Sequence, residues 1–407
     1  MLRVRLGVLG LALLTGLASP ATASAAPAAA PTVEEQRLDR AVPQEILARS
    51  GFASVAPEFA RALAGARSYA DARAVVARDG AALWRRAVDH AQGRGPVGGD
   101  LSRGDDRPLY WARLGMTREV RGWEPEFGLS SGQRAALIGE LERTSRGQAD
   151  IGYPAREGGV KRVLVTGFDP FTLDADIRIS NPSGASALAL DGTVVRTARG
   201  LARIETAVFP VRWADFTDGV VERALRPHLP SLDLLTTVSQ GRVGRFDIER
   251  TNGAWRGGFW DNDNIGRTET IPVTDPASQP QWTTTTLPYA AIVAAPTGPF
   301  PVYDNTTVTE IPAGGTFPVE RPDGPTPGST AREGGGGDYL SNEIAYRATL
   351  LRDRLGLSTS LPAGHVHTPV LEFGPDNPDQ VTDPQFVSNR EAIVGQVREI
   401  VRVAVGS

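Results

Sequence analysis

Cysteine is absent from the 407 residues, and lysine occurs once, at Lys161. The lack of cysteine excludes disulfides, thiolate metal ligands and a cysteine nucleophile. The formal net charge is −4 at pH 7, and the chain has no block of basic residues that could follow a phosphate backbone, so we expect no nucleic-acid partner. The four histidines are not spaced as metal ligands. The composition therefore predicts neither a metal site nor a cofactor.

Long apolar runs are lacking outside the N-terminus. There, Arg3 and Arg5 precede an apolar stretch at residues 6–18, and small residues follow at 21–25. This three-part layout is typical of a secretory signal, and the apolar stretch is shorter than the roughly 20 residues that span a bilayer. We expect a signal peptide at residues 1–25 and a secreted protein without membrane contact after cleavage. Residence at a bacterial cell surface is the alternative.

Two kinds of pattern divide the rest of the chain. Residues 26–150 carry helix signals almost exclusively, and Ser130 and Gln133 have the spacing of a capping box. We expect this region to be all-helical and to pack on the body as a cap or prodomain. A stretch rich in Gly and Pro, residues 147–159, follows it and predicts the domain boundary.

Residues 160–407 alternate buried-strand runs with helical stretches. This alternation predicts an α/β domain with three layers, α/β/α, around a mostly parallel sheet. Residues 294–337 are rich in Pro, Thr and Gly without periodicity and predict an irregular insertion. Ser388 and Glu391, spaced as a second capping box, predict the start of the last helix.

Two carboxylates, Asp247 and Glu249, follow one of the predicted strands. Loops at the carboxyl ends of parallel strands are where open α/β sheets bind ligands, so a carboxylate is well placed there. The alternative is a structural role, in which Asp247 or Glu249 pairs with Arg245 or Arg250.

Ser341 and two histidines, His365 and His367, are the other candidates for chemistry. Ser341 lies at the start of a predicted helix, where the helix field favours negative charge and suits a nucleophile. A plain N-cap is the alternative for it. His365 and His367 share one face of a predicted strand, and simple packing is the alternative for both.

Glu249, Ser341 and His367 together have the composition of a catalytic triad. In such a triad a hydroxyl attacks, an imidazole takes its proton, and a carboxylate orients the imidazole and stabilises its charge. The three residues come from distant parts of the chain, so the hypothesis requires the fold to bring them to one cleft.

Short motifs around these residues resemble type I pyroglutamyl peptidases, the pyrrolidone-carboxylate peptidases. The resemblance covers residues 161 to about 373 and leaves the helical region out. Its motifs are Val163-Leu164-Val165-Thr166-Gly167-Phe168-Asp169-Pro170-Phe171, Asn181-Pro182-Ser183, Phe209-Pro210-Val211, Ser239-Gln240-Gly241, Ile248-Glu249-Arg250, Asp261-Asn262, Thr286-Leu287-Pro288, Tyr339-Leu340-Ser341-Asn342 and His365-Val366-His367-Thr368-Pro369.

The resemblance implies a peptidase that removes N-terminal pyroglutamate from peptides. Ser341 lies where the family has its catalytic Cys, Glu249 would orient His367, and His367 would act as general base and then acid. The residues that the resemblance places around the five-membered lactam ring are Phe168, Phe171 and Gln240.

Two features of the sequence differ from the family, and two alternative functions follow. Ser replaces Cys at position 341, and two residues fewer separate Ile248 from Glu249. The first alternative is an inactive relative that binds a peptide or protein partner through the same pocket. The second is a serine hydrolase that acts on an ester or another amide.

Overall fold

The computed structural model describes residues 29–96, 98–154 and 159–407. The expected signal peptide at residues 1–25 lies outside the described residues. Among the helices of the described ranges, none combines the length and the apolar character that crossing a bilayer requires.

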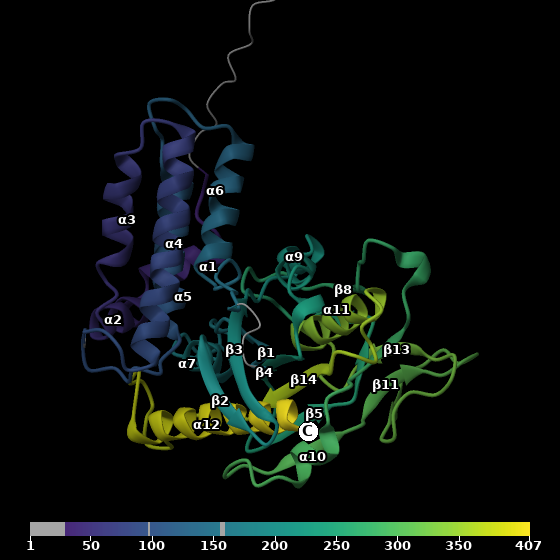
Figure 1. Cartoon of the computed structure of the whole chain (residues 1–407). Helices are drawn as coiled ribbons and strands as arrows, with labels where there is room; N and C mark the ends of the chain where they lie inside the picture. The colour runs from purple at the N-terminus through teal and green to yellow at the C-terminus, as the bar shows by residue number, and fades with distance from the viewer. Residues whose placement is uncertain (1–28, 97, 155–158) are drawn as a thin grey trace, which may run out of the picture.

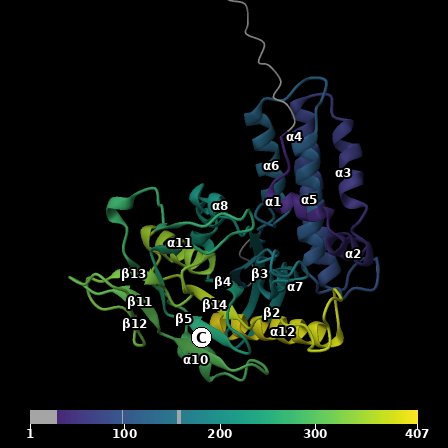
Figure 2. The same ribbon diagram turned by 180° about the vertical axis from the view of Figure 1, so that it is seen from behind.

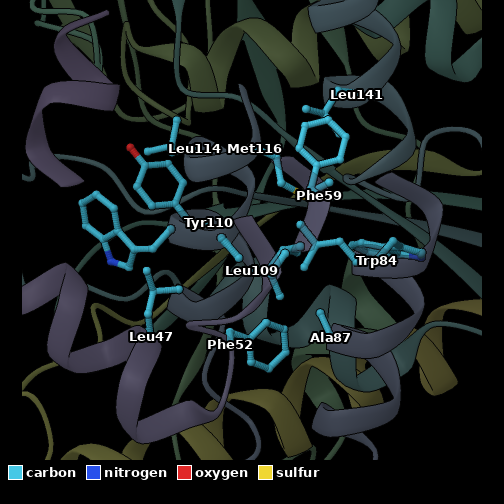
Figure 3. Close-up of a cluster of buried hydrophobic side chains, with 14 of the residues drawn as sticks. Leu47, Phe52, Phe59, Trp84, Ala87, Leu109, Tyr110, Leu114, Met116 and Leu141 are labelled. Carbon is cyan, nitrogen blue, oxygen red and sulfur yellow. The ribbon is translucent and has the colours of Figure 1, made fainter. Parts of the chain in front are cut away.

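The N-terminal region is helical, as expected, and α3 to α6 stand side by side as a bundle at one end of the molecule (Figures 1 and 2). Ser130 caps α6, and the predicted capping box with Gln133 is present. Large apolar side chains, including Phe59, Trp84 and Leu109, fill the space between these helices (Figure 3). The helices of this region are α1 (Val33–Gln36), η1 (Arg37–Asp39), α2 (Ala41–Ser50), α3 (Val55–Ala64), α4 (Tyr69–Ala91), α5 (Arg107–Gly122) and α6 (Ser131–Thr144).

A seven-stranded sheet, counted over the described residues, forms the centre of the body in the order β10-β5-β14-β4-β1-β3-β2. Four of its six neighbouring pairs are parallel, and the pairs β14–β5 and β2–β3 are antiparallel. The strands are β1 (Lys161–Phe168), β2 (Thr193–Thr197), β3 (Gly200–Phe209), β4 (Leu234–Gln240), β5 (Phe246–Glu249), β10 (Val302–Asn305) and β14 (Ala363–Thr368).

Helices cover both faces of this sheet, because successive side chains of a strand point to opposite faces and the central strands are apolar on both. In β1, Val163 and Val165 belong to the core under α7 (Pro182–Leu190) and α12 (Pro384–Gly406), which lies along one face (Figure 1). Leu164 faces the other core, under α8 (Trp213–Thr217), α9 (Val220–Leu225) and α11 (Leu340–Arg354). The expected α/β fold, with a mostly parallel sheet after a helical region, is confirmed.

Residues 294–337, all described, were expected to be an irregular insertion, but they contain four short strands. β10 joins the edge of the main sheet, while β11 (Val308–Ile311), β12 (Val319–Arg321) and β13 (Thr330–Glu333) form a separate antiparallel sheet at the end far from the helical bundle (Figures 1 and 2). These strands have only three or four residues each, too few to show a period among the surrounding Pro and Gly. The short elements η2 (Leu229–Ser231), β6 (Thr251–Gly253), β7 (Trp255–Gly257), β8 (Thr268–Thr270), η3 (Pro276–Ser278), β9 (Trp282–Thr284) and α10 (Tyr289–Ala294) complete the body.

The predicted start of the last helix is also wrong. α12 begins at Pro384 with Asp383 as its N-cap, and the Asp383 side chain accepts a hydrogen bond from the Phe386 N–H. Asp is among the best N-cap residues and Pro is favoured at the first helical position, so these two residues start the helix before Ser388 and Glu391 are reached.

Candidate active site

Glu249 and His367 meet on neighbouring strands. β5 and β14 pair antiparallel, and their alternation sends Ile248 and Val366 into the core under α12, whereas Glu249 and His367 face the side of α11. His367 Nδ1 lies 2.7 Å from Glu249 Oε1, and both side chains are buried. The two missing residues between Ile248 and Glu249 therefore do not separate the carboxylate from the imidazole.

The carboxylate of Glu249 is held from several sides. Its Oε2 accepts a hydrogen bond of 2.7 Å from Asn305 Nδ2 of β10, and Arg242 Nη1 lies 3.9 Å from Oε1. A Cβ atom on Gly335 would lie 2.2 Å from Oε2, so any larger residue there would force the carboxylate or the loop to move. The surroundings leave the carboxylate little freedom to move, which is what a residue that orients an imidazole requires.

The neighbouring carboxylate, Asp247, takes the structural role that was the alternative for both. Arg242 Nη1 donates to Asp247 Oδ2 at 2.8 Å, and Arg245 Nε donates to the same oxygen at 3.2 Å. Arg250 pairs with Asp304 of β10 at 3.0 Å. Within one short strand, Asp247 is thus paired with arginines while Glu249 contacts the histidine.

His365 is a packed residue rather than a second candidate base. Its two ring nitrogens lie 2.8 Å from the hydroxyls of Thr237 and Ser239 of β4, and it is fully buried. Burial, and to a smaller extent the neighbouring His367, lower the pKa of His365 well below its ordinary value. A neutral His365 adds no positive charge beside His367, whose ring centroid is 4.7 Å away.

Ser341 lies in the first turn of α11 but does not cap it. The N-cap is Tyr339, and the Ser341 hydroxyl donates to the Gly336 carbonyl at 3.0 Å, so it does not play the N-cap role of accepting from a backbone N–H of the helix. Asn342 fixes this helix start, because its side chain accepts from the Gly253 N–H and donates to the Gly253 carbonyl, both at 2.8 Å. The first N–H groups of a helix have no partner within it, so the positive end of the α11 dipole lies close to the Ser341 hydroxyl.

Gly336 is close to both the Ser341 hydroxyl and the His367 imidazole. Its carbonyl receives the Ser341 hydroxyl, and a Cβ atom placed on it would lie 3.2 Å from His367 Cε1 and 3.4 Å from Asn342 N. Among the described residues, no hydrogen bond joins Ser341 to His367. Glu249 and His367 are thus in direct contact, and Gly336 is a residue that both Ser341 and His367 approach. Catalytic hydrogen bonds are often long or absent until substrate binds, so this spacing is compatible with a triad.

A small cavity of about 70 Å³ opens beside Ser341. The three residues that the resemblance placed around a ligand, Phe168, Phe171 and Gln240, all line it. Gln240 Oε1 accepts from the Leu371 N–H at 3.2 Å. The other five lining residues had no role predicted from the sequence, although all of them lie in the quoted motifs: Asn181, Val211, Ser239, Tyr339 and Leu340.

A larger cavity, of about 680 Å³, lies elsewhere, between α6 and the α8–α9 side of the body. None of the predicted site residues lines it. Six arginines do, but four of them are already paired with carboxylates, so its charge is largely neutralised: Arg121, Arg143, Arg146 and Arg212. Of the predicted site residues, Ser341, Phe168, Phe171 and Gln240 line the small cavity, whereas Glu249 and His367 are not among its lining residues. The small cavity is therefore the better candidate for substrate binding.

Part of the chain is similar to solved peptidases. A mutant pyrrolidone carboxyl peptidase from Pyrococcus furiosus is 21% identical and has a TM-score of 0.40, over 60% of this chain and 97% of that one. A pyroglutamyl peptidase I from Bacillus amyloliquefaciens is 19% identical with a TM-score of 0.42, over 61% of this chain and 96% of that one. Pyrrolidone carboxyl peptidase from Thermococcus litoralis is 19% identical with a TM-score of 0.39, over 60% and 93%.

Sequence matches to one family extend over most of the chain. Residues 17–142 match the model of the PA0049 N-terminal domain, and residues 162–277 and 299–372 match that of the PA0049 C-terminal domain. The uncharacterized protein PA0049 of Pseudomonas aeruginosa is 34% identical over 93% of this chain and 90% of that protein. The chain belongs to the PA0049 family.

Proposed function

We propose that this protein is a hydrolase that removes N-terminal pyroglutamate from peptides, with Ser341 as nucleophile, His367 as general base and acid, and Glu249 as the orienting carboxylate. The observation that carries the proposal is the buried pair of Glu249 and His367 at 2.7 Å, beside Gly336, whose carbonyl accepts the Ser341 hydroxyl. Acyl transfer by a serine needs a hydroxyl that attacks, an imidazole that takes its proton, and a carboxylate that orients the imidazole.

The proposed reaction proceeds in two steps. Ser341 Oγ attacks the carbonyl carbon of the pyroglutamyl residue while its proton passes to His367 Nε2. Collapse of the tetrahedral intermediate breaks the C–N bond, and the leaving amine takes that proton. Water then gives a proton to His367 and attacks the ester, which releases pyroglutamate and restores the Ser341 hydroxyl. Glu249, on Nδ1, keeps Nε2 free for these transfers and stabilises the imidazolium.

The cavity suits a small cyclic amide. Phe168 and Phe171 supply apolar walls, and a few polar groups among such walls are typical of small-molecule sites. Because the Leu371 N–H holds Gln240 Oε1, the Gln240 amide nitrogen is the group left to donate to a lactam carbonyl. Backbone N–H groups of the first turn of α11 would stabilise the oxyanion.

One observation favours the second candidate, an inactive relative that binds a peptide or protein partner through the same cavity. The Ser341 proton is directed to the Gly336 carbonyl rather than to His367. A serine hydroxyl, unlike a thiol, is weakly nucleophilic until a base removes its proton. If Gly336 holds the hydroxyl in this way when substrate is bound, the cavity would bind without turnover.

Hydrolysis of a pyroglutamyl coumarin amide by the purified protein, by Ser341→Ala and by Ser341→Cys tests the proposal. We expect turnover by the unchanged protein, none by Ser341→Ala, and retained turnover by Ser341→Cys. Equal turnover by the unchanged protein and Ser341→Ala would remove Ser341 from the mechanism. If none of the three turns over, calorimetry with pyroglutamate decides for binding alone, and labelling of Ser341 by a fluorophosphonate together with ester hydrolysis decides for another substrate.

We also propose that the protein acts outside the cytoplasm. The support is the basic, apolar and small-residue layout of residues 1–25. Fractionation of the native host, with N-terminal sequencing of the protein recovered outside the cells, tests this. Recovery of a chain that begins after Ala25 is the expected result, and full-length protein confined to the cytoplasm contradicts it.

A further inference from the structure

Asp169 lies in the loop that forms one wall of the small cavity. Its neighbour Phe168 and the nearby Phe171 line that cavity, but the Asp169 carboxylate points elsewhere and is 2% exposed. Asp169 Oδ2 lies 2.8 Å from Arg113 Nη2 and 2.8 Å from Arg146 Nη2. Arg146 Nε donates to the same oxygen at 3.1 Å.

Both arginines come from the helical region. Arg113 belongs to α5 and Arg146 follows the end of α6, and their side chains are 0% and 1% exposed. Arg146 also pairs with Glu142. Arg113 makes no hydrogen bond of good geometry within the described chain, so the charge of Asp169 is its main compensation.

A second set of contacts from the helical region holds the same loop farther along. Arg37 donates to both oxygens of Asp174, at 3.0 and 2.6 Å, and to the Asn262 carbonyl at 2.5 Å. Asn262 Nδ2 in turn donates to the Pro170 carbonyl at 2.9 Å. The loop is thus joined to the helical region at Asp169, at Asp174 and, through Asn262, at Pro170.

The charges explain why this arrangement couples the two regions. A buried carboxylate is tolerated only when cations and hydrogen bonds compensate it, and the body alone would leave Asp169 without its two arginines. The carboxylate would then move toward water and carry Phe168 and Phe171 with it. The position of this cavity wall therefore depends on residues outside the α/β domain.

We infer that the helical region is a working part of the candidate site, in which Arg113 and Arg146 act as positioning residues that hold Asp169 and with it the Phe168–Phe171 wall. The inference rests on the proposed function for its kinetic consequence. A role as a detachable prodomain is not compatible with it, because removal of the helices would deprive the wall of its cationic partners.

The test compares Arg113→Met, which removes the charge at similar length, with Arg113→Lys, which keeps it. Arg390→Met is the matched control. Arg390 is likewise a buried arginine without a good hydrogen bond, and it pairs with Asp105 of the helical region at 3.4 Å, but it does not contact the Phe168–Phe171 loop. All variants are made in the full chain, and thermal melting establishes that each one folds.

Hydrogen exchange is the first measurement, because it does not depend on activity. The Phe168 N–H donates to Ser183 Oγ and the Asp169 N–H to the Phe209 carbonyl, both at 3.0 Å, so these amides report on the loop. We expect them to exchange at least tenfold faster in Arg113→Met and near the normal rate in Arg113→Lys and Arg390→Met. Unchanged exchange in Arg113→Met, or an equal increase in Arg390→Met, overturns the inference.

Kinetics on the pyroglutamyl substrate supply the second measurement. We expect Arg113→Met to raise KM about tenfold, to change kcat less than threefold, and to leave the labelling rate of Ser341 by a fluorophosphonate unchanged. An unchanged KM overturns the inference. Should the unchanged protein show no turnover, the proposed function fails, and the exchange data still decide about the loop. Should Arg113→Met not fold, Asp169→Asn replaces it with the same expectations.

Discussion

Replacing Glu249 by Gln removes a charge from the proposed triad with little change in shape. The Gln side chain must face two partners that both need an acceptor, the His367 Nδ1–H and Asn305 Nδ2. Its amide group offers one acceptor and one donor, so one of the two contacts is lost. If the amide nitrogen turns toward His367, Nδ1 becomes an acceptor and the ring proton moves to Nε2, where the base must be free.

The size of the effect follows from the contact between imidazole and carboxylate. With roughly 4 Å between the charge centres and an effective dielectric constant of about 20, the carboxylate stabilises the imidazolium by about 4 kcal/mol. Each 1.36 kcal/mol corresponds to a factor of ten in rate, so kcat should fall about 1000-fold. Arg242, 3.9 Å from the carboxylate, remains positive in the variant and opposes the imidazolium, so it does not offset the loss.

The assay is steady-state hydrolysis of a pyroglutamyl coumarin amide, with Asp247→Asn as the control. Asp247 is buried in the same strand but pairs with arginines, so its variant should stay within tenfold of the unchanged protein. For Glu249→Gln we expect a nearly unchanged KM together with the large fall in kcat. A kcat within tenfold of the unchanged protein, in a variant that melts normally, would refute the assignment of Glu249.

Three further predictions concern the surroundings of the site and the stability of the fold. In Gly335→Ala the added Cβ would lie 2.2 Å from Glu249 Oε2, so the carboxylate must shift; kcat should fall about 100-fold, and a variant as active as the unchanged protein would show that the loop adapts. Burial raises the pKa of Glu205 to about 7 from its ordinary 4.5. The folded state therefore holds that proton more tightly, and the free energy of unfolding should fall by at most about 3 kcal/mol as pH rises from 4.5 to 7. Urea titrations of Glu205→Gln should show a smaller fall, and an identical pH profile would contradict this. Arg256→Met removes a bidentate partner of the buried Glu343 and should destabilise the fold by about 3 kcal/mol in urea unfolding, whereas a loss below about 1 kcal/mol would mean that the carboxylate is compensated otherwise.

The sequence was a good guide to the fold wherever an element carries its own signal. The apolar runs of β1 and β4 and the Ser130 capping box needed no tertiary information. The strands within residues 294–337 could not be found in this way, because elements of three or four residues are stabilised by pairing with distant strands. In β11 the buried residues alternate as Val308 and Glu310, but Glu310 is charged, so there was no apolar alternation to detect.

The candidate site shows the same limit at the level of side chains. Motif order brought Glu249 and His367 together, and they are in contact, but the grouping of Ser341 with them stays a prediction. Motif order also could not show that Ser341 donates to the Gly336 carbonyl. The ion pair of Arg113 with Asp169 could not be predicted from the sequence either, because it joins two regions that share no sequence pattern.

The covalent intermediate is the most direct test of the whole account. The purified protein is mixed with a pyroglutamyl ester, quenched in acid within milliseconds to seconds, digested and examined by mass spectrometry. The account predicts a pyroglutamyl adduct on the peptide that contains Ser341, which is absent from Ser341→Ala and accumulates more slowly in Glu249→Gln. Product release without any adduct on that peptide, or an adduct on a different residue, would contradict it.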